Sequence, residues 1–164
     1  MPLDEIESVD LKQVLTEVGS SICKEFSNKI FAISRSFSSK GKIMVKGGDI
    51  VGDVLRKVFD NATRYNERDV IEIGVKVTRP KGPSGMRYWQ VEISDNGLGI
   101  PHSQKSVLLS TPDESHRLIR GIYSSIPFCV SLLGHIGGEL TIGDRVQDQP
   151  EKGAKIVLTF PEGG

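Results

Sequence analysis

The chain has 164 residues, of which 21 are basic and 21 acidic, so its formal net charge is zero. This balance argues against a nucleic-acid-binding surface as the main function, and the length suits one domain with a substantial core. The longest mostly apolar run, residues 126–134, is too short to span a bilayer, and the first residues lack the apolar segment of a secretion signal. Because Cys23 and Cys129 lie outside any pairing motif, we expect a cytoplasmic protein without membrane contact.

The first third of the chain predicts a helix, two short strands and a second helix. Apolar residues recur at three- and four-residue steps over residues 9–26, and Asp10 is placed to cap this helix. Residues 29–33 and 43–45 have the length and composition of short strands. Asp49 is a suitable N-cap for the next helix, which runs to residue 65. Its core face comprises Val51, Val54, Leu55, Val58, Phe59 and Ala62.

A row of polar residues flanks that apolar face. Lys57, Asn61 and Arg64 are spaced by four and three residues, which aligns them along one side of the helix. An asparagine with a cation one turn away suits a metal-bound phosphate. An ordinary solvated helix face is the alternative, and the row alone favours that alternative.

The middle of the chain predicts an antiparallel hairpin that ends on an acid. Residues 70–78 and 88–94 alternate in polarity, and the Pro- and Gly-rich residues 79–85 connect them. The second strand delivers Asp95 into the turn Asp-Asn-Gly-Leu-Gly-Ile-Pro. A carboxylate in such a turn suits a flat ligand with amino donors, because glycines let the backbone approach it closely. An ordinary capped strand-to-helix turn is the alternative.

The last third predicts a polar segment, a helix and two strands. Residues 102–124 are polar and broken, which is typical of a mobile segment over a site. A buried helix is expected over 126–133, followed by strands at 139–146 and 154–160. The whole order of elements predicts an α+β, two-layer sandwich: a mixed, mostly antiparallel sheet covered on one face by about three helices.

Four stretches of the chain carry a family resemblance. Residues 59–65 (Phe-Asp-Asn-Ala-Thr-Arg-Tyr) resemble the end of an N box, and residues 95–101 match a G1 box in full. Residues 132–140 resemble the helix-to-strand step of a G2 region, and 153–161 resemble the final strand. Together they are similar to the ATP-binding domain of the gyrase, chaperone, histidine-kinase and MutL superfamily (the Bergerat fold), and within it to histidine kinases.

The resemblance implies a magnesium–ATP site with roles assigned by position. Asp95 would accept a hydrogen bond from the adenine amino group, and Asn61 would coordinate the magnesium ion that bridges the phosphates. Arg64 would add positive charge on the phosphate side. The nucleotide-binding residues implied in this way are Asn61, Arg64, Tyr65, Asp95, Gly97, Gly99, Gly121 and Ser125.

Two departures from the family pattern fall on the phosphate side. Lys57 stands where the family usually has Asn or Glu, and a lysine neither accepts a proton at neutral pH nor ligates magnesium. That function is therefore missing or replaced by a phosphate contact. Both glycines of the G2 signature are absent from residues 123–126, although Gly121 lies close by. Glycines at this place let backbone amides cap phosphates at a helix N-terminus.

The acceptor of a phosphoryl group must come from elsewhere if the resemblance holds. None of His102, His116 and His135 is placed as a phosphoacceptor, so we expect residues 1–164 to be one ATP-binding domain without dimerisation, phosphoacceptor or sensor domains. Its expected partners are the phosphoacceptor helix domain of a parent histidine kinase and a response regulator of a two-component system.

Two other functions remain open. The first is a degenerate domain with weak or no nucleotide binding that acts through protein–protein contacts. The second is an ATPase module or an anti-sigma serine kinase of the same superfamily. Lys57 counts against the second, because those members rely on a glutamate at that place as general base.

Overall fold

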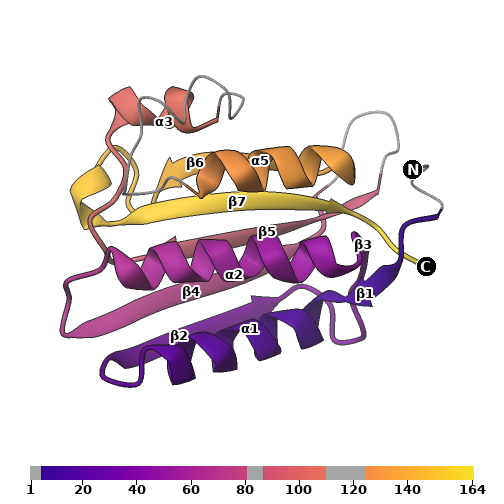
Figure 1. Ribbon diagram of the computed structural model, residues 1–164, viewed down its shortest axis with the longest axis horizontal. Coiled ribbons are helices and arrows are strands. Elements are labelled where there is room, and N and C mark those ends of the chain that lie inside the picture. Colours follow the sequence, from indigo (N-terminus) through magenta and orange to yellow (C-terminus); the bar gives the residue numbers. More distant parts are fainter. Residues whose placement is uncertain (1–4, 81–86, 110–124) are drawn as a thin grey trace.

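A five-stranded sheet, in the order β2-β4-β5-β7-β6, is covered on one face by helices α1, α2 and α5 (Figure 1). This computed structural model describes residues 5–80, 87–109 and 125–164. The arrangement confirms the predicted α+β sandwich. The strands are β2 (Ile30–Phe37), β4 (Val70–Thr78), β5 (Tyr88–Asp95), β6 (Glu139–Asp144) and β7 (Ala154–Pro161), and the three helices are α1 (Leu11–Glu25), α2 (Asp49–Arg64) and α5 (Ile126–His135).

The sheet is mixed because a single pair, β2 with β4, is parallel, whereas the other neighbours are antiparallel. The predicted hairpins β4–β5 and β6–β7 are both present. Alternation along β5 and β7 turns every second side chain toward the helices, so that Ile93 and Ile156 face each other in the core.

Helix α2 lies at the centre of the helical layer, between α1 and α5 (Figure 1). All six residues of its predicted core face are buried. The predicted cap of α1 is also confirmed, since the Asp10 carboxylate accepts a hydrogen bond of 3.1 Å from the Lys12 amide. The predicted cap of α2 is wrong: Gly48, with φ of 51°, is the N-cap, and Asp49 is the first helical residue without a capping side-chain bond.

Four elements differ from the sequence prediction. Strand β1 (Ser8–Asp10) overlaps the first two residues of the helix predicted at 9–26, and it pairs antiparallel with β3 (Met44–Lys46) in a separate ribbon. Strand β2 continues to Phe37 because all eight of its residues pair with β4. A short helix α3 (His102–Leu108) begins the segment expected to be irregular, and a 3₁₀ turn η3 (Pro150–Lys152) precedes β7.

Most of the loop predicted at residues 79–85, and the predicted mobile segment beyond residue 109, lie outside the described residues. Within the described ranges, no helix is both long enough and apolar enough to cross a lipid bilayer.

Candidate functional site

The carboxylate of Asp95 is fixed at the end of the central strand β5. Its Oδ1 atom accepts hydrogen bonds from the Gly97 amide at 2.9 Å and from the Ala154 amide at 3.3 Å. The residue is 8% exposed, and burial raises the pKa of this carboxyl although both amide bonds act in the opposite direction. Oδ2 makes no hydrogen bond with the described residues, so one oxygen remains available to an external donor.

Two glycines allow the backbone to pass this carboxylate closely. Gly99 has a φ of 72°, and a Cβ atom there would lie 1.7 Å from the carbonyl oxygen of Pro150. Gly153 has a φ of 122°, and its Cβ would lie 1.9 Å from the carbonyl oxygen of Asp95. Neither position therefore accommodates another residue without movement of the backbone. The β5–α3 turn and the β6–β7 turn are thus locked against each other at the candidate site.

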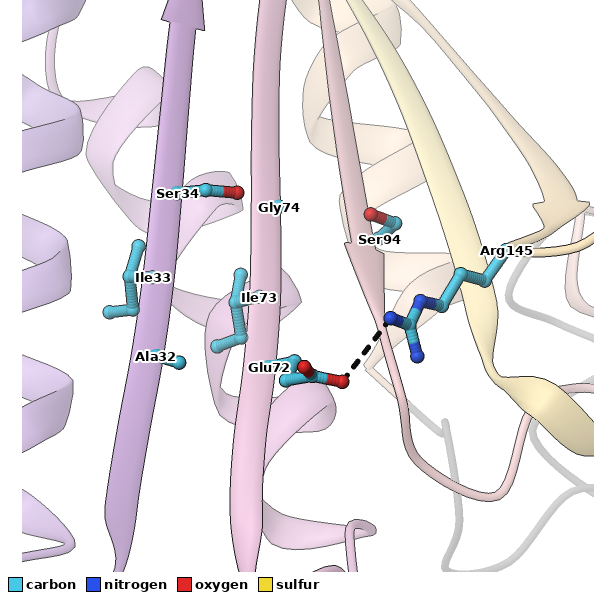
Figure 2. A pocket seen from close by; sticks show the side chains of 8 residues that line it. All are labelled: Ala32, Ile33, Ser34, Glu72, Ile73, Gly74, Ser94 and Arg145. Carbon is cyan, nitrogen blue, oxygen red and sulfur yellow. Dashed lines mark hydrogen bonds and ion pairs between the residues drawn. The ribbon is translucent and has the colours of Figure 1, made fainter.

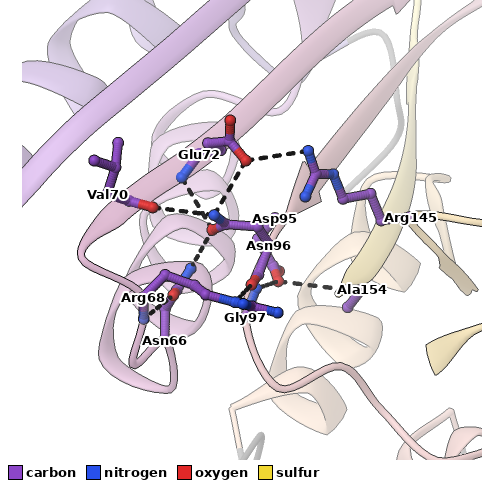
Figure 3. Close-up of polar contacts among 9 residues, drawn as sticks. All are labelled: Asn66, Arg68, Val70, Glu72, Asp95, Asn96, Gly97, Arg145 and Ala154. Carbon is purple, nitrogen blue, oxygen red and sulfur yellow. Dashed lines mark hydrogen bonds and ion pairs between the residues drawn. The ribbon is translucent and has the colours of Figure 1, made fainter. Parts of the chain in front are cut away.

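A network of hydrogen bonds around the buried Asn96 side chain supports this turn (Figure 3). Asn96 accepts hydrogen bonds through Oδ1 from Asn66 Nδ2 at 2.8 Å and from the Glu72 amide at 3.0 Å. Its Nδ2 donates to the Val70 carbonyl at 3.0 Å and to the Glu72 carboxylate at 3.1 Å. Every polar atom of the Asn96 side chain is therefore satisfied within the protein, and this residue supports the site rather than binding a ligand.

The turn also contacts the C-terminal end of α2. The Leu98 amide donates to the Tyr65 carbonyl at 3.4 Å, and a Cβ on Gly97 would lie 3.1 Å from the same oxygen. Tyr65, which the resemblance places in the pocket wall, is half-buried and packs against the core. The structure therefore brings together Tyr65, Asp95, Gly97 and Gly99, four of the eight predicted site residues.

Two more predicted site residues, Asn61 and Ser125, contact each other beside α2, one helical turn before Tyr65. Asn61 Nδ2 donates to the hydroxyl of Ser125 at 2.8 Å, immediately before α5 begins. The amide oxygen of Asn61 makes no hydrogen bond within the described ranges. Asn61 is half-buried, and its amide oxygen fits a magnesium ion, which takes few protein oxygens and keeps several waters.

The structure does not place the two remaining predicted residues, Arg64 and Gly121, at the site. Arg64 is exposed and forms a bidentate pair with Asp60, with hydrogen bonds of 3.1 Å from Nε and Nη2. The hydrogen bond to Asp60 raises the pKa of the Arg64 guanidinium, whose carbon also lies 5.4 Å from the Phe26 ring centre. Gly121 lies outside the described residues.

Helix α3 is tied to the end of β6 through a nearly buried carboxylate. Lys105 Nζ lies 2.6 Å from Asp144 Oδ1, and the Asp144 side chain is only 5% exposed. His102, which is not expected to be a phosphoacceptor, lies beside this pair, with its Nε2 3.7 Å from Asp144 Oδ2. The start of the segment that follows the Asp95 turn is therefore anchored to the same β6–β7 unit that supplies Gly153.

A separate hollow of about 370 Å³ lies on the opposite, helix-free face of the sheet (Figure 2). Small side chains leave it open, because Ser34, Gly74 and Ser94 stand next to one another on adjacent strands. The pair between Glu72 and Arg145, 3.2 Å apart, crosses its edge. Strand alternation turns Ser94 away from the side on which Asp95 lies, so this hollow is not continuous with the candidate site.

Sequence reasoning missed the supporting residues Asn66, Asn96 and Glu72. The sequence signal for the asparagines was their turn-forming character, which gives no indication of burial. Their contacts join residues separated by 24 to 30 positions, so only the fold brings them together.

Comparisons with known proteins agree with this geometry. The sequence model of a family described as histidine kinase-, DNA gyrase B- and HSP90-like ATPase matches residues 46–164. Among solved structures, a mycobacterial sensor histidine kinase, MprB, aligns over 96% of this chain and 97% of its own with a TM-score of 0.74 and 18% identity. The nucleotide-free catalytic domain of the histidine kinase ThkA aligns over 96% and 98% of the two chains, with a TM-score of 0.74 and 15% identity.

A third structure, full-length ShkA in complex with AMPPNP, has a TM-score of 0.70 and 17% identity. The alignment covers 98% of this chain but only 32% of ShkA. No curated protein matches the sequence.

The two-layer sandwich and the glycine-flanked carboxylate define an ATP-binding domain with the Bergerat fold. The chain belongs to the family of histidine kinase-, DNA gyrase B- and HSP90-like ATPases, since that family's model matches well over half of it. This confirms the fold and the superfamily that the N box and G1 box residues indicated.

Proposed function

We propose that this chain binds magnesium–ATP as the catalytic domain of a sensor histidine kinase in a two-component system. The observation that carries the proposal is the Asp95 carboxylate, which has one oxygen held by two backbone amides and the other available. An adenine amino group is a donor that matches this free oxygen. The similar folds of solved histidine kinase structures support the same proposed function.

On the phosphate side we assign Asn61 as the residue that would hold magnesium. When bound, a magnesium ion neutralises phosphate charge and orients the triphosphate for transfer. The protein's own contribution is positioning: Asp95 and the glycine turn fix the base, and α2 runs from that turn along the phosphates. Ser125, at the start of α5, is the described residue of the altered G2 region closest to Asn61.

The acceptor we propose is a histidine on another segment or chain. In the transfer, the bond between the γ-phosphorus and the bridging oxygen breaks, ADP keeps its electron pair, and a new nitrogen–phosphorus bond forms. A neutral imidazole attacks through a lone pair, so no proton has to be removed from the attacking atom first. A serine hydroxyl or a water would need a general base, and Lys57 occupies the helix position where one would stand.

Residues 1–164 are proposed to act as one cytoplasmic ATP-binding domain. Its proposed partners are the phosphoacceptor helix domain of the parent kinase and a cognate response regulator.

One observation favours the alternative of a degenerate domain. Of the two residues expected on the phosphate side, Arg64 is held away from it by its bidentate pair with Asp60, and Asn61 donates its amide group to Ser125 rather than to a ligand. A domain of this kind would bind nucleotide weakly and act through protein contacts.

Calorimetric titration with AMPPNP, with and without magnesium, tests the proposal. We expect binding that is strengthened by magnesium, and we expect Asn61→Ala to remove that strengthening while leaving the magnesium-free affinity almost unchanged. Circular dichroism of the variant controls for folding. Absence of any binding at millimolar nucleotide would contradict the proposal and favour the degenerate domain.

A further inference from the structure

A groove of about 430 Å³ runs between α2 and α5, next to the predicted phosphate side. Ser125, which bonds Asn61, lines it from the start of α5, and Leu132 lines it about two turns later. The wall contributed by α2 is charged. Its lining residues are Asp53, Arg56, Lys57 and Asp60.

Two of the charged side chains in this groove are already engaged elsewhere. Arg56 binds Glu25 at 2.7 Å and the Ser21 hydroxyl at 2.6 Å, both on α1. Asp60 holds Arg64 in the bidentate pair described above. Lys57 makes neither an ion pair nor a hydrogen bond with the described residues, so its ammonium is the cation available to a ligand in the groove.

The position of Lys57 relative to the base-binding end follows from helix geometry. The Tyr65 carbonyl contacts the glycine turn, Asn61 lies one turn earlier in α2, and Lys57 lies one turn earlier again. At a rise of 1.5 Å per residue, Lys57 is about 12 Å along the axis from Tyr65. From the C-terminal end of α2 toward its N-terminus, the order is therefore the contact with the glycine turn at Tyr65, the proposed magnesium ligand Asn61, and the ammonium of Lys57.

The opposite wall also carries positive potential. Helix α5 has ten residues, and its N-terminus begins at the groove without a side-chain cap on Ser125. The charge of Lys57 reaches this helix: burial raises the pKa of the Cys129 thiol to about 12, and Lys57 is the group that opposes the rise. Two acids are among the described residues that line the groove. Asp60 is engaged with Arg64, and Asp53 lies a turn beyond Lys57, which places the favourable region between Lys57 and Ser125.

We infer that Lys57 binds the terminal phosphate of the nucleotide and makes the site selective for a triphosphate over a diphosphate. The inference rests on the proposed function, since it requires a nucleotide whose base lies at Asp95. A lysine suits this role because its compact ammonium donates to phosphate oxygens without requiring a fixed plane. In this domain the position would therefore supply charge rather than acid–base chemistry.

The test compares AMPPNP with ADP, both with magnesium, on the same protein by calorimetry. We expect the wild type to prefer AMPPNP, and Lys57→Gln to weaken AMPPNP about tenfold, or about 1.4 kcal/mol. ADP affinity should change less than about twofold, because ADP lacks the phosphate that Lys57 contacts. Lys57→Arg, which keeps the charge, should retain most of the preference.

Lys76→Gln is the matched control, because Lys76 is exposed on the helix-free face of the sheet and its loss changes net charge equally. If Lys57→Gln left the AMPPNP affinity unchanged, or weakened both nucleotides alike, the inference would be overturned while the proposed function stood. If the wild type bound ADP and AMPPNP equally, the inference would also fall. If neither nucleotide bound, the proposed function itself would fail, and this inference with it.

Discussion

The two ends of the candidate site are built by different means. At the base end, Asp95 is held by backbone amides, and two glycine turns are locked against each other by contacts that admit no side chain. The phosphate end is formed by the side chains of Asn61, Ser125 and Lys57, and the first two are bonded to each other. The proposed base end is therefore fixed by the fold, whereas the proposed phosphate end consists of side chains that can exchange partners.

The largest effect is expected where a side chain is forced into the base end. Gly99→Ala should lower the free energy of unfolding by about 3 kcal/mol, because alanine is strained at a φ of 72° and its Cβ meets Pro150. Chemical denaturation measures the change.

Gly134→Ala is the matched control for Gly99→Ala. A Cβ at Gly134 meets nothing within 4 Å, and the residue lies inside α5. This substitution should stabilise the protein by about 0.5–1 kcal/mol. Equal effects of the two substitutions would show that the base end is not locked as described.

A smaller loss is expected when the network behind the turn is removed. Asn96→Ala leaves the Val70 carbonyl, the Glu72 amide and the Asn66 amide group without their partner, and should cost about 2 kcal/mol. Gln13→Ala, which removes only an exposed bond to Glu17, should cost less than about 0.5 kcal/mol. If thermal unfolding gave both variants the same midpoint as wild type, the network would not support the turn.

The extent to which the sequence predicted these regions follows from the range of the interactions. Periodic burial predicted all six core residues of α2, and the Asp10 cap was predicted because its bond spans two residues. Strand β1 was missed because it is defined only by pairing with β3, which lies more than 30 residues away. Motif residues predicted the carboxylate, but the amide of Ala154 that holds it belongs to a strand 59 residues later.

A smaller and more specific effect concerns pH at the base end. Burial raises the pKa of Asp95, so its carboxyl gains a proton at a higher pH in the folded chain than in the unfolded one. For this group alone, protonation therefore stabilises the folded protein. The contribution is fully present below the pKa that Asp95 has in the unfolded chain, and it is lost as the pH rises through the higher pKa that Asp95 has in the folded chain. Nucleotide affinity should change with pH in the opposite direction and fall as the pH falls. The reason is that a protonated Oδ2 would face the adenine amino group as a second donor.

We therefore expect AMPPNP affinity to fall on acidification at a pH above the ordinary Asp value of 3.8. The maximal slope for one group is about tenfold per pH unit. Calorimetric titrations at a series of pH values give this slope, and circular dichroism at each pH confirms that the protein remains folded. A pH-independent affinity down to the ordinary value would mean that the Asp95 carboxylate does not contact the base.

From the fixed geometry of the base end we propose that Asp95 selects adenine through its free acceptor oxygen. At the equivalent positions adenine carries an amino donor and guanine a carbonyl acceptor. The direct measurement is the affinity for ATP and for GTP, each with magnesium, of the wild type and of Asp95→Asn. We predict a strong preference for ATP in the wild type, and an ATP affinity about a hundredfold lower in the variant with the preference lost. A variant that retained the wild-type preference for ATP would contradict the claim.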